Sequence, residues 1–173
     1  MKITIICLLF LLSSCGSYHI EGGGAFNIGN YEQRAKDSTT GTGFYVKAGW
    51  YRYREEGIGI SLNYQPNIGY FSFPTASTIG FGTAELKYRK LIGVENKPKI
   101  GLGFGLGGGL TLSEGGTSSF DIGSGSGELS LHTKNGKIYG ILRSKHYLNL
   151  GNLKPENNGA YNHAFQVGAG FNF

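Results

Sequence analysis

An alternation of apolar and other side chains, with a period of two residues, runs through this chain from about residue 24 to its last residue. Successive side chains of a β-strand point to opposite faces, so this period is typical of strands with two unlike faces. Eight segments show it, around 24–28, 44–51, 58–65, 84–89, 100–106, 128–132, 138–147 and 163–173. No helical period is sustained after Cys15, and 31 glycines also favour strands over helices. The chain is therefore predicted to be all-β.

The connections between the eight segments alternate in length. The stretches 30–42, 66–77, 113–124 and 148–161 are long and polar, whereas 55–57, 91–97 and 134–137 are short. The last contains Asn135-Gly136, the dipeptide that a type I′ hairpin turn favours. Long connections at one end and short turns at the other are the pattern of an outer-membrane barrel, whose chain ends both lie on the periplasmic side.

The two faces of the predicted strands distinguish a membrane barrel from a soluble one. One face is almost purely apolar. The other combines many glycines with charged residues, namely Lys47, Glu85, Lys87, Arg89, Glu128 and Arg143. A narrow eight-stranded barrel fills its interior with side chains, where charges can pair, and turns its apolar face to lipid. We therefore predict an eight-stranded antiparallel up-and-down transmembrane β-barrel, with a soluble barrel or sandwich as the alternative.

The amino terminus predicts export from the cytoplasm. Lys2 is followed by an apolar run from Ile3 to Leu12 and then by Ser13-Ser14-Cys15, the arrangement of a bacterial signal peptide. The run is too short to span a bilayer as a helix, which needs about 20 residues. Because 12–15 resembles a lipobox, residues 1–14 are predicted to be removed and Cys15 to carry lipid. A plain secretory signal or an uncleaved anchor is the alternative.

Cleavage before Cys15 also limits the chemistry of the mature chain. Its one remaining cysteine would carry lipid, so disulfides and cysteine metal sites are excluded. The predicted organisation is a lipidated segment at 15–22 and a barrel at 23–173. The formal net charge of +5 is scattered rather than gathered in a run, which argues against a nucleic-acid partner. The four histidines show no metal-ligand spacing, so no metal or other cofactor is expected.

His146 falls on the apolar face of the predicted seventh strand. It shares its parity with Ser144 and Leu148, whereas Arg143 and Lys145 take the opposite face. The strand rises from a short turn toward a long connection, so His146 and Ser144 are expected to face lipid near the outer rim. Polar groups on a lipid-facing surface are costly, which favours a functional role.

The end of the chain carries an ordered set of motifs. The sequence 146–149, His-Tyr-Leu-Asn, is followed by Pro-Glu-Asn-Asn-Gly at 155–159 and by a last segment that ends at Phe173. This order resembles that of lipid A 3-O-deacylases of the PagL type, eight-stranded outer-membrane barrels that hydrolyse an ester-linked acyl chain of lipopolysaccharide. Their motif near the end of the seventh strand is His-x-Ser-Asn. The likeness covers the carboxyl-terminal part in motif and the whole mature chain in architecture only.

This resemblance implies a lipid A ester hydrolase with His146 as base, Asn149 at the oxyanion site and Glu156 as a candidate acidic member. Leu148 stands where the family has its nucleophilic serine, and leucine has no oxygen that could attack an ester. Ser144 is the candidate substitute, with an unidentified group as the alternative, because two strand residues separate Cα atoms by about 6.6 Å, a gap that leaning side chains can close.

The partners implied are lipopolysaccharide or another outer-membrane lipid, the outer membrane itself and the barrel assembly machinery. Phe173 resembles the terminal aromatic residue by which bacterial barrels are recognised for assembly. The missing serine at Leu148 favours a second hypothesis, a non-catalytic outer-membrane barrel lipoprotein with a structural or surface-binding role.

Overall fold

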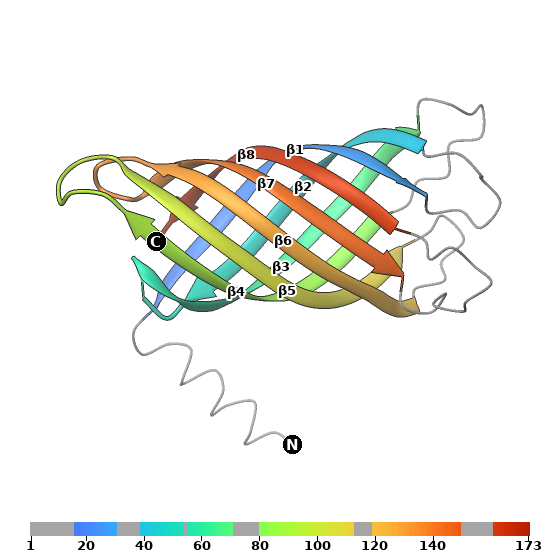
Figure 1. Cartoon of the computed structure of the whole chain (residues 1–173), viewed down its shortest axis with the longest axis horizontal. Coiled ribbons are helices and arrows are strands. Elements are labelled where there is room, and N and C mark those ends of the chain that lie inside the picture. The colour runs from blue at the N-terminus through green and yellow to red at the C-terminus, as the bar shows by residue number, and fades with distance from the viewer. Residues whose placement is uncertain (1–15, 31–38, 54, 71–79, 113–118, 150–160) are drawn as a thin grey trace, which may run out of the picture.

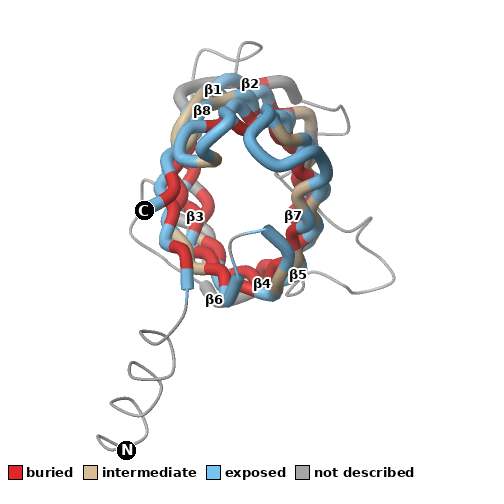
Figure 2. The backbone as a smooth tube through the Cα atoms, turned by 90° about the vertical axis from the view of Figure 1, so that its left-hand side faces the viewer, coloured by how far each residue is buried: buried red, intermediate tan, exposed pale blue. Residues whose placement is uncertain are grey.

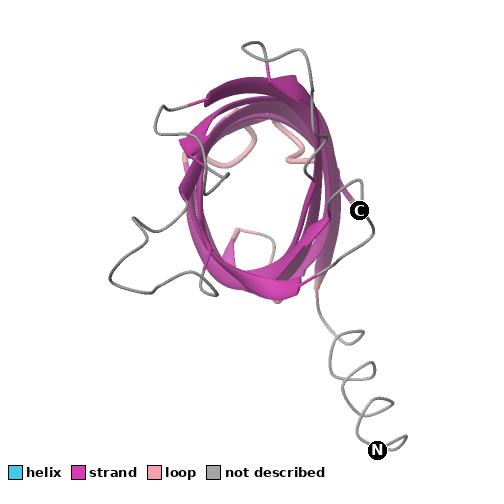
Figure 3. Cartoon of the chain, turned by 90° about the vertical axis from the view of Figure 1, so that its right-hand side faces the viewer, coloured by secondary structure: helices cyan, strands magenta, loops and turns pink. Residues whose placement is uncertain are grey.

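Eight antiparallel strands form one closed barrel in the computed structural model, which describes residues 16–30, 39–53, 55–70, 80–112, 119–149 and 161–173. The strands are β1 (Ser17–Asn30), β2 (Thr39–Tyr51), β3 (Glu56–Tyr70), β4 (Gly80–Ile92), β5 (Lys99–Leu112), β6 (Ser119–His132), β7 (Ile138–Asn149) and β8 (Tyr161–Asn172). Each pairs with its neighbours in chain order, and β8 pairs with β1 to close the ring (Figures 1 and 3). The predicted fold class is confirmed. Among the described residues, no helix is long and apolar enough to cross a membrane.

The two ends of the barrel differ in their connections. At one end, which we call the turn end, residues 52–55, 93–98 and 133–137 join consecutive strands. Both chain ends of the barrel lie there, because the amide of Phe173 donates to the carbonyl of Tyr18 at 2.8 Å. The connections 31–38, 71–79, 113–118 and 150–160, at what we call the loop end, lie outside the described residues. The strand bounds make 31–38, 71–79 and 150–160 longer than every connection at the turn end, as predicted, whereas 113–118 has the same length as 93–98.

The connection between β6 and β7 departs from the predicted turn type. A type I′ turn needs positive φ at both central residues, but only Gly136 has it, at 64°, and Asn135 does not. The side chain of Asn135 instead accepts from the backbone amide of Lys137 at 3.0 Å, and the amide of Gly136 donates to the carbonyl of Thr133 at 2.7 Å. The side chain of Asn135 thus acts as a local acceptor and stabilises a connection that is longer than the two-residue loop of a type I′ turn.

Three strands extend into stretches that the sequence assigned to other segments. β1 begins at Ser17, so residues 17–22 belong to the barrel and not to a separate amino-terminal segment. β3 continues to Tyr70, and β6 begins at Ser119. The reason is that polar residues at these positions face the lumen: Glu21 and Ser124 are buried. In a barrel with a polar interior, a polar run therefore does not mark the end of a strand.

Exposed and buried residues alternate along the described parts of the strands (Figure 2), and most of the large exposed side chains are apolar or aromatic. Leu62, Leu106 and Val167 are each about three-fifths exposed or more. The strands have 12 to 15 residues, and a tilted strand needs about 9–11 to cross the hydrocarbon layer. An exterior of this kind is stable in lipid and costly in water, so the barrel has the surface of a membrane-spanning protein.

Buried ion pairs fill the lumen. The carboxylate of Glu128 contacts Lys87 and lies 3.1 Å from Arg143 Nη2 and 3.7 Å from Lys47 Nζ. Glu21 also pairs with Arg143, and lies 3.5 Å from Lys47 Nζ. Further along the lumen, Glu85 pairs with Lys145 at 2.7 Å. Charges withdrawn from water need such partners. The pairs Glu128–Arg143 and Glu21–Lys47 join neighbouring strands, and the others link strands across the barrel.

The inward face of β5 is made of glycines, and these make room for the charges. A Cβ atom at Gly103 would lie 2.8 Å from Cγ of Glu128, and one at Gly105 would lie 3.2 Å from Cγ of Lys87. Any larger residue there would push against the central ion pair. The sequence of this glycine run is similar to that of a nucleotide-binding loop, but packing inside a narrow barrel explains it.

Candidate lipid-facing site on β7 and β8

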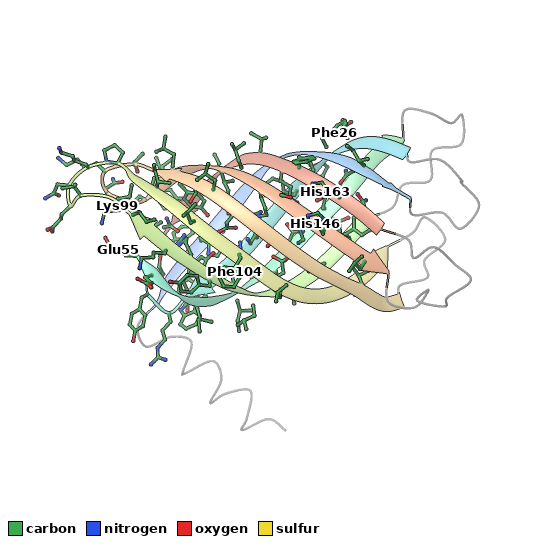
Figure 4. The ribbon with its side chains drawn as sticks, viewed as in Figure 1. Phe26, Glu55, Lys99, Phe104, His146 and His163 are labelled. Atoms are coloured by element: carbon green, nitrogen blue, oxygen red, sulfur yellow. The ribbon has the colours of Figure 1, made fainter. Side chains whose placement is uncertain are left out.

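Three polar side chains meet on the outer surface of β7 and β8. His146 and His163 are directly opposite each other in the pairing of the two strands, and Ser144 is opposite Phe165. Nδ1 of His146 lies 2.9 Å from Nδ1 of His163, and the hydroxyl of Ser144 lies 3.3 Å from Nε2 of His163. Figure 4 shows the two histidines side by side in the half of the barrel nearer the loop end. We call this group the Ser-His-His cluster.

Two arrangements of protons satisfy both contacts, and they differ in whether Nε2 of His163 donates to the hydroxyl of Ser144 or accepts from it. The two Nδ1 atoms can form a hydrogen bond only if one carries a proton and the other a lone pair. If His163 carries it, His163 donates to His146, and its own Nε2 is left with a lone pair that accepts from the hydroxyl of Ser144. In that tautomer His163 is oriented by His146 and is poised to take the serine proton, which is the relation of a base to a nucleophile.

Polar side chains are few on the outer surface. Among the described outward-facing strand residues, those that are neither apolar nor aromatic are Glu56 and Lys90 near the turn end and Thr42, Ser144, His146 and His163 nearer the loop end. Glu56 and Lys90 pair with each other at 3.0 Å. Three of the remaining four form the Ser-His-His cluster. Polar groups facing lipid are costly, so their concentration on two adjacent strands favours a function.

Aromatic residues indicate the depth of the cluster. Tyr18 and Trp50 are opposite each other near the turn end, and Phe26 and Phe165 are opposite each other nearer the loop end. Tyr18 and Phe26 are separated by about 26 Å along β1, which at the usual strand tilt is close to the height of the apolar band of such barrels. The Ser-His-His cluster lies at the Phe165 level and beyond it toward the loop end, at the depth of a lipid headgroup boundary.

A depression of about 450 Å³ adjoins Ser144 on the lipid-facing surface. Its outward-facing lining consists of Gly127, Leu129, Leu142, Ser144, Phe165 and Val167. Gly127 is directly opposite Ser144 on β6, and a Cβ atom there would have no neighbour within 4 Å. The serine hydroxyl therefore lies beside an open apolar surface that a hydrocarbon chain could occupy.

The sequence placed Ser144 and His146 on one outward face, and the structure agrees. Arg143 and Lys145 are buried in the lumen, as the alternation requires. The serine hydrogen bond goes to His163, a residue that sequence reasoning missed as a partner. His163 lies two residues from the outward-facing Phe165 on β8, so the two residues face the same side of the strand. This spacing could have identified His163 as an outward-facing residue from the sequence. His163, and not His146, is in contact with the hydroxyl.

The other candidate residues are placed only in part. Asn149 is the last residue of β7, and its side chain lies outside the described residues; Glu156 and Cys15 lie outside them entirely. Their roles therefore stay predictions. Leu148 faces outward and is half exposed, on the same face as Ser144. It adjoins the Ser-His-His cluster as an apolar neighbour.

The remaining histidines lie in the lumen and take no part in this site. His132 stacks on Tyr139 with 4.7 Å between ring centroids, and His19 stacks on Tyr51 at 5.0 Å. Within the part of the chain that the structure describes, no group of three or more histidine, cysteine or acidic residues could hold a metal ion. A serine hydroxyl beside a histidine nitrogen is an arrangement that can support nucleophilic attack with histidine as base.

Comparison with known proteins identifies the fold. The structure is similar to Neisserial surface protein A (NspA), with a TM-score of 0.61, 12% identity, and coverage of 90% of this chain and 97% of that chain. The outer membrane protein OprG of Pseudomonas aeruginosa has a TM-score of 0.50 and 13% identity, with 92% and 96% covered. Ail, the attachment invasion locus protein of Yersinia pestis, solved with the heparin analogue sucrose octasulfate, has a TM-score of 0.41 and 15% identity, with 92% and 99% covered.

No family model matches this chain, and no curated protein matches it in sequence. At identities this low the likeness to NspA and OprG establishes a shared fold, that of small outer-membrane barrels, and nothing more. The resemblance to lipid A deacylases in residues 146–159 is neither supported nor contradicted by these comparisons.

Proposed function

We propose that this protein is an outer-membrane barrel that hydrolyses an ester-linked acyl chain of an envelope lipid at its outer surface, with lipid A as the first candidate substrate. The observation that carries the proposal is the hydrogen-bonded Ser-His-His cluster on a surface whose described residues are mostly apolar. The proposal places the protein in the outer membrane, with Cys15 carrying the lipid anchor predicted from the sequence. The lumen is filled by ion pairs, which argues against a transport function.

The proposed reaction uses Ser144 as nucleophile and His163 as base. The serine oxygen attacks the ester carbonyl carbon while its proton passes to Nε2 of His163. The tetrahedral intermediate collapses as the bond to the alcohol breaks, the alcohol takes the proton from His163, and an acyl-serine remains. Water then attacks the acyl-serine, again giving its proton to His163, which returns it to Ser144 as the carboxylic acid leaves.

His146 is assigned a positioning role. By accepting from Nδ1 of His163 it fixes the tautomer in which Nε2 faces the serine, and it stabilises the imidazolium that forms when the serine proton is transferred. The sequence prediction made His146 the base; we propose that His163 takes that role, because it contacts the hydroxyl. Asn149 remains the candidate for the oxyanion site and Glu156 the candidate acidic member.

A second candidate function is that of a non-catalytic outer-membrane barrel with a structural or surface-binding role. Leu148 favours it, because a leucine stands where the deacylase motif has its nucleophile. On this hypothesis the Ser-His-His cluster would contact lipid headgroups without cleaving them.

Mass spectrometry of the envelope lipids distinguishes the two functions. Cells would express the wild type, Ser144→Ala or His163→Ala, with Thr42→Ala as a matched control that removes an outward hydroxyl elsewhere on the loop side. The hydrolase predicts loss of one acyl chain from lipid A or a phospholipid in the wild type and in Thr42→Ala only. Unchanged lipids in all strains, with folded protein in the outer membrane, would leave the non-catalytic function.

A further inference from the structure

Two shallow depressions lie one after the other on the outer surface of β6, β7 and β8. The first, of about 450 Å³, adjoins Ser144. The second, of about 400 Å³, lies on the turn side, and its outward-facing lining consists of Ile100, Leu129, Leu131, Gly140, Leu142 and Val167. Leu129, Leu142 and Val167 line both, and the strand pairing places these three side by side in one row. The depressions therefore lie on the two sides of this row and share it as a wall.

Small residues create the depressions. Gly127 is opposite Ser144 on the loop side of the row, and Gly140 is opposite Leu131 and Ala169 on its turn side. A Cβ atom at either glycine would meet nothing within 4 Å. Neither glycine is required by close packing of the backbone, and so each leaves open a surface that a larger side chain could cover.

The direction of the depressions gives the orientation of an occupant. They extend from Ser144 toward the turn end, away from the aromatic level of Phe165, and Ser144 and Gly140 are about 13 Å apart along the strand. One leaflet of the hydrocarbon layer is about 15 Å thick. A lipid whose ester lies at Ser144 and whose chain fills both depressions has its headgroup toward the loop end, which is the orientation of a lipid in the outer leaflet.

We propose that Gly127 and Gly140 keep open an acyl-binding groove for one chain of an outer-leaflet lipid, running from Ser144 toward the turn end. This inference rests on the proposed function, and it adds the leaflet, the path of the chain and two specificity-determining residues. Hydrocarbon gains little by exchanging lipid for leucine, so the groove acts by shape: it holds one chain in place so that the ester meets the Ser-His-His cluster.

The test uses the barrel folded in short-chain detergent and two ester probes, p-nitrophenyl acetate and p-nitrophenyl dodecanoate. Gly140→Leu fills the turn-side part of the groove, four residues from Ser144, whereas Gly127→Leu fills the part that adjoins Ser144. Ala84→Leu adds bulk to the exposed face of β4, across the barrel, as the control. We expect Gly140→Leu to lower kcat/KM for the dodecanoate about tenfold or more and to leave the acetate rate within about twofold. Gly127→Leu is expected to lower the dodecanoate rate as well, and Ala84→Leu is expected to change the rate of neither ester.

The outcomes separate the groove from the reaction. Equal dodecanoate rates in Gly140→Leu and the wild type would overturn the groove while the hydrolase stands. If the wild type cleaves neither ester, the proposed function fails, and native mass spectrometry with dodecanoyl lysophosphatidylglycerol then decides the groove. One lipid retained by the wild type and Ala84→Leu but lost from Gly140→Leu supports it, and equal retention by all three overturns it.

Discussion

Replacing Glu128 by glutamine removes a carboxylate from the centre of the lumen. Glu128 contacts Lys87, and lies within 3.1 Å of Arg143 and 3.7 Å of Lys47. Arg143 keeps its pair with Glu21, but the partner that the structure gives Lys87 is lost. Removing one member of a buried ion pair costs about 3–5 kcal/mol, because the remaining charge stays buried and unneutralised. We therefore expect Glu128→Gln to lower the free energy of unfolding by about 3–5 kcal/mol.

Urea unfolding of the barrel in detergent measures this loss. Trp50 is the single tryptophan and lies on the outer surface, so its fluorescence reports the transfer of the barrel wall to water. Glu56→Gln is the matched control, since Glu56 pairs with Lys90 in the open, and an exposed pair contributes about 1 kcal/mol or less. A loss below about 1 kcal/mol in Glu128→Gln would refute the reasoning, because the lumen network would then contribute no more than a surface pair.

Three further predictions follow from the two faces of the barrel. Gly103→Ala should lower the free energy of unfolding by about 1–3 kcal/mol, because the new methyl meets Glu128. Gly127→Ala has open space around its Cβ and should change the free energy of unfolding by less than about 0.5 kcal/mol. Equal effects of the two substitutions in the same urea titration would contradict this. Thr42→Val should stabilise the barrel, since an outward hydroxyl leaves the lipid-facing surface, and a lower unfolding midpoint would count against a membrane exterior. The wild type should give no steady ion current in planar bilayers, and a stable open conductance would contradict a filled lumen.

The fold could be predicted because the period-two alternation and the lengths of the connections together indicate how the strands are arranged. The strand face that carries Lys47, Lys87 and Glu128 can be buried only inside a closed barrel. The alternating connections give the direction of each strand. The ends of the strands were harder to predict from the sequence. Most residues of 17–22 and 119–124 are polar or small, as in a connection, yet both stretches are strand because the lumen accepts polar side chains.

The candidate site was predictable only within one strand. Parity alone places Ser144 and His146 on the outer face of β7, because a strand allows no other choice. The contact of Ser144 with His163 depends on the register between β7 and β8, which lie on either side of 150–160. Sequence spacing does not fix that register, since the length of a connection does not determine which residues end up opposite each other. The outward parity of His163 was the available signal.

Covalent labelling of the folded barrel with a fluorophosphonate tests the central claim, that His163 activates Ser144 on the lipid-facing surface. The measurement is the mass of the peptide that contains Ser144 after the reaction. The account predicts one phosphonyl adduct on Ser144 in the wild type and a loss of at least tenfold in its rate of formation in His163→Gln. An unlabelled Ser144 in folded wild-type protein, or equal labelling in His163→Gln, would contradict it.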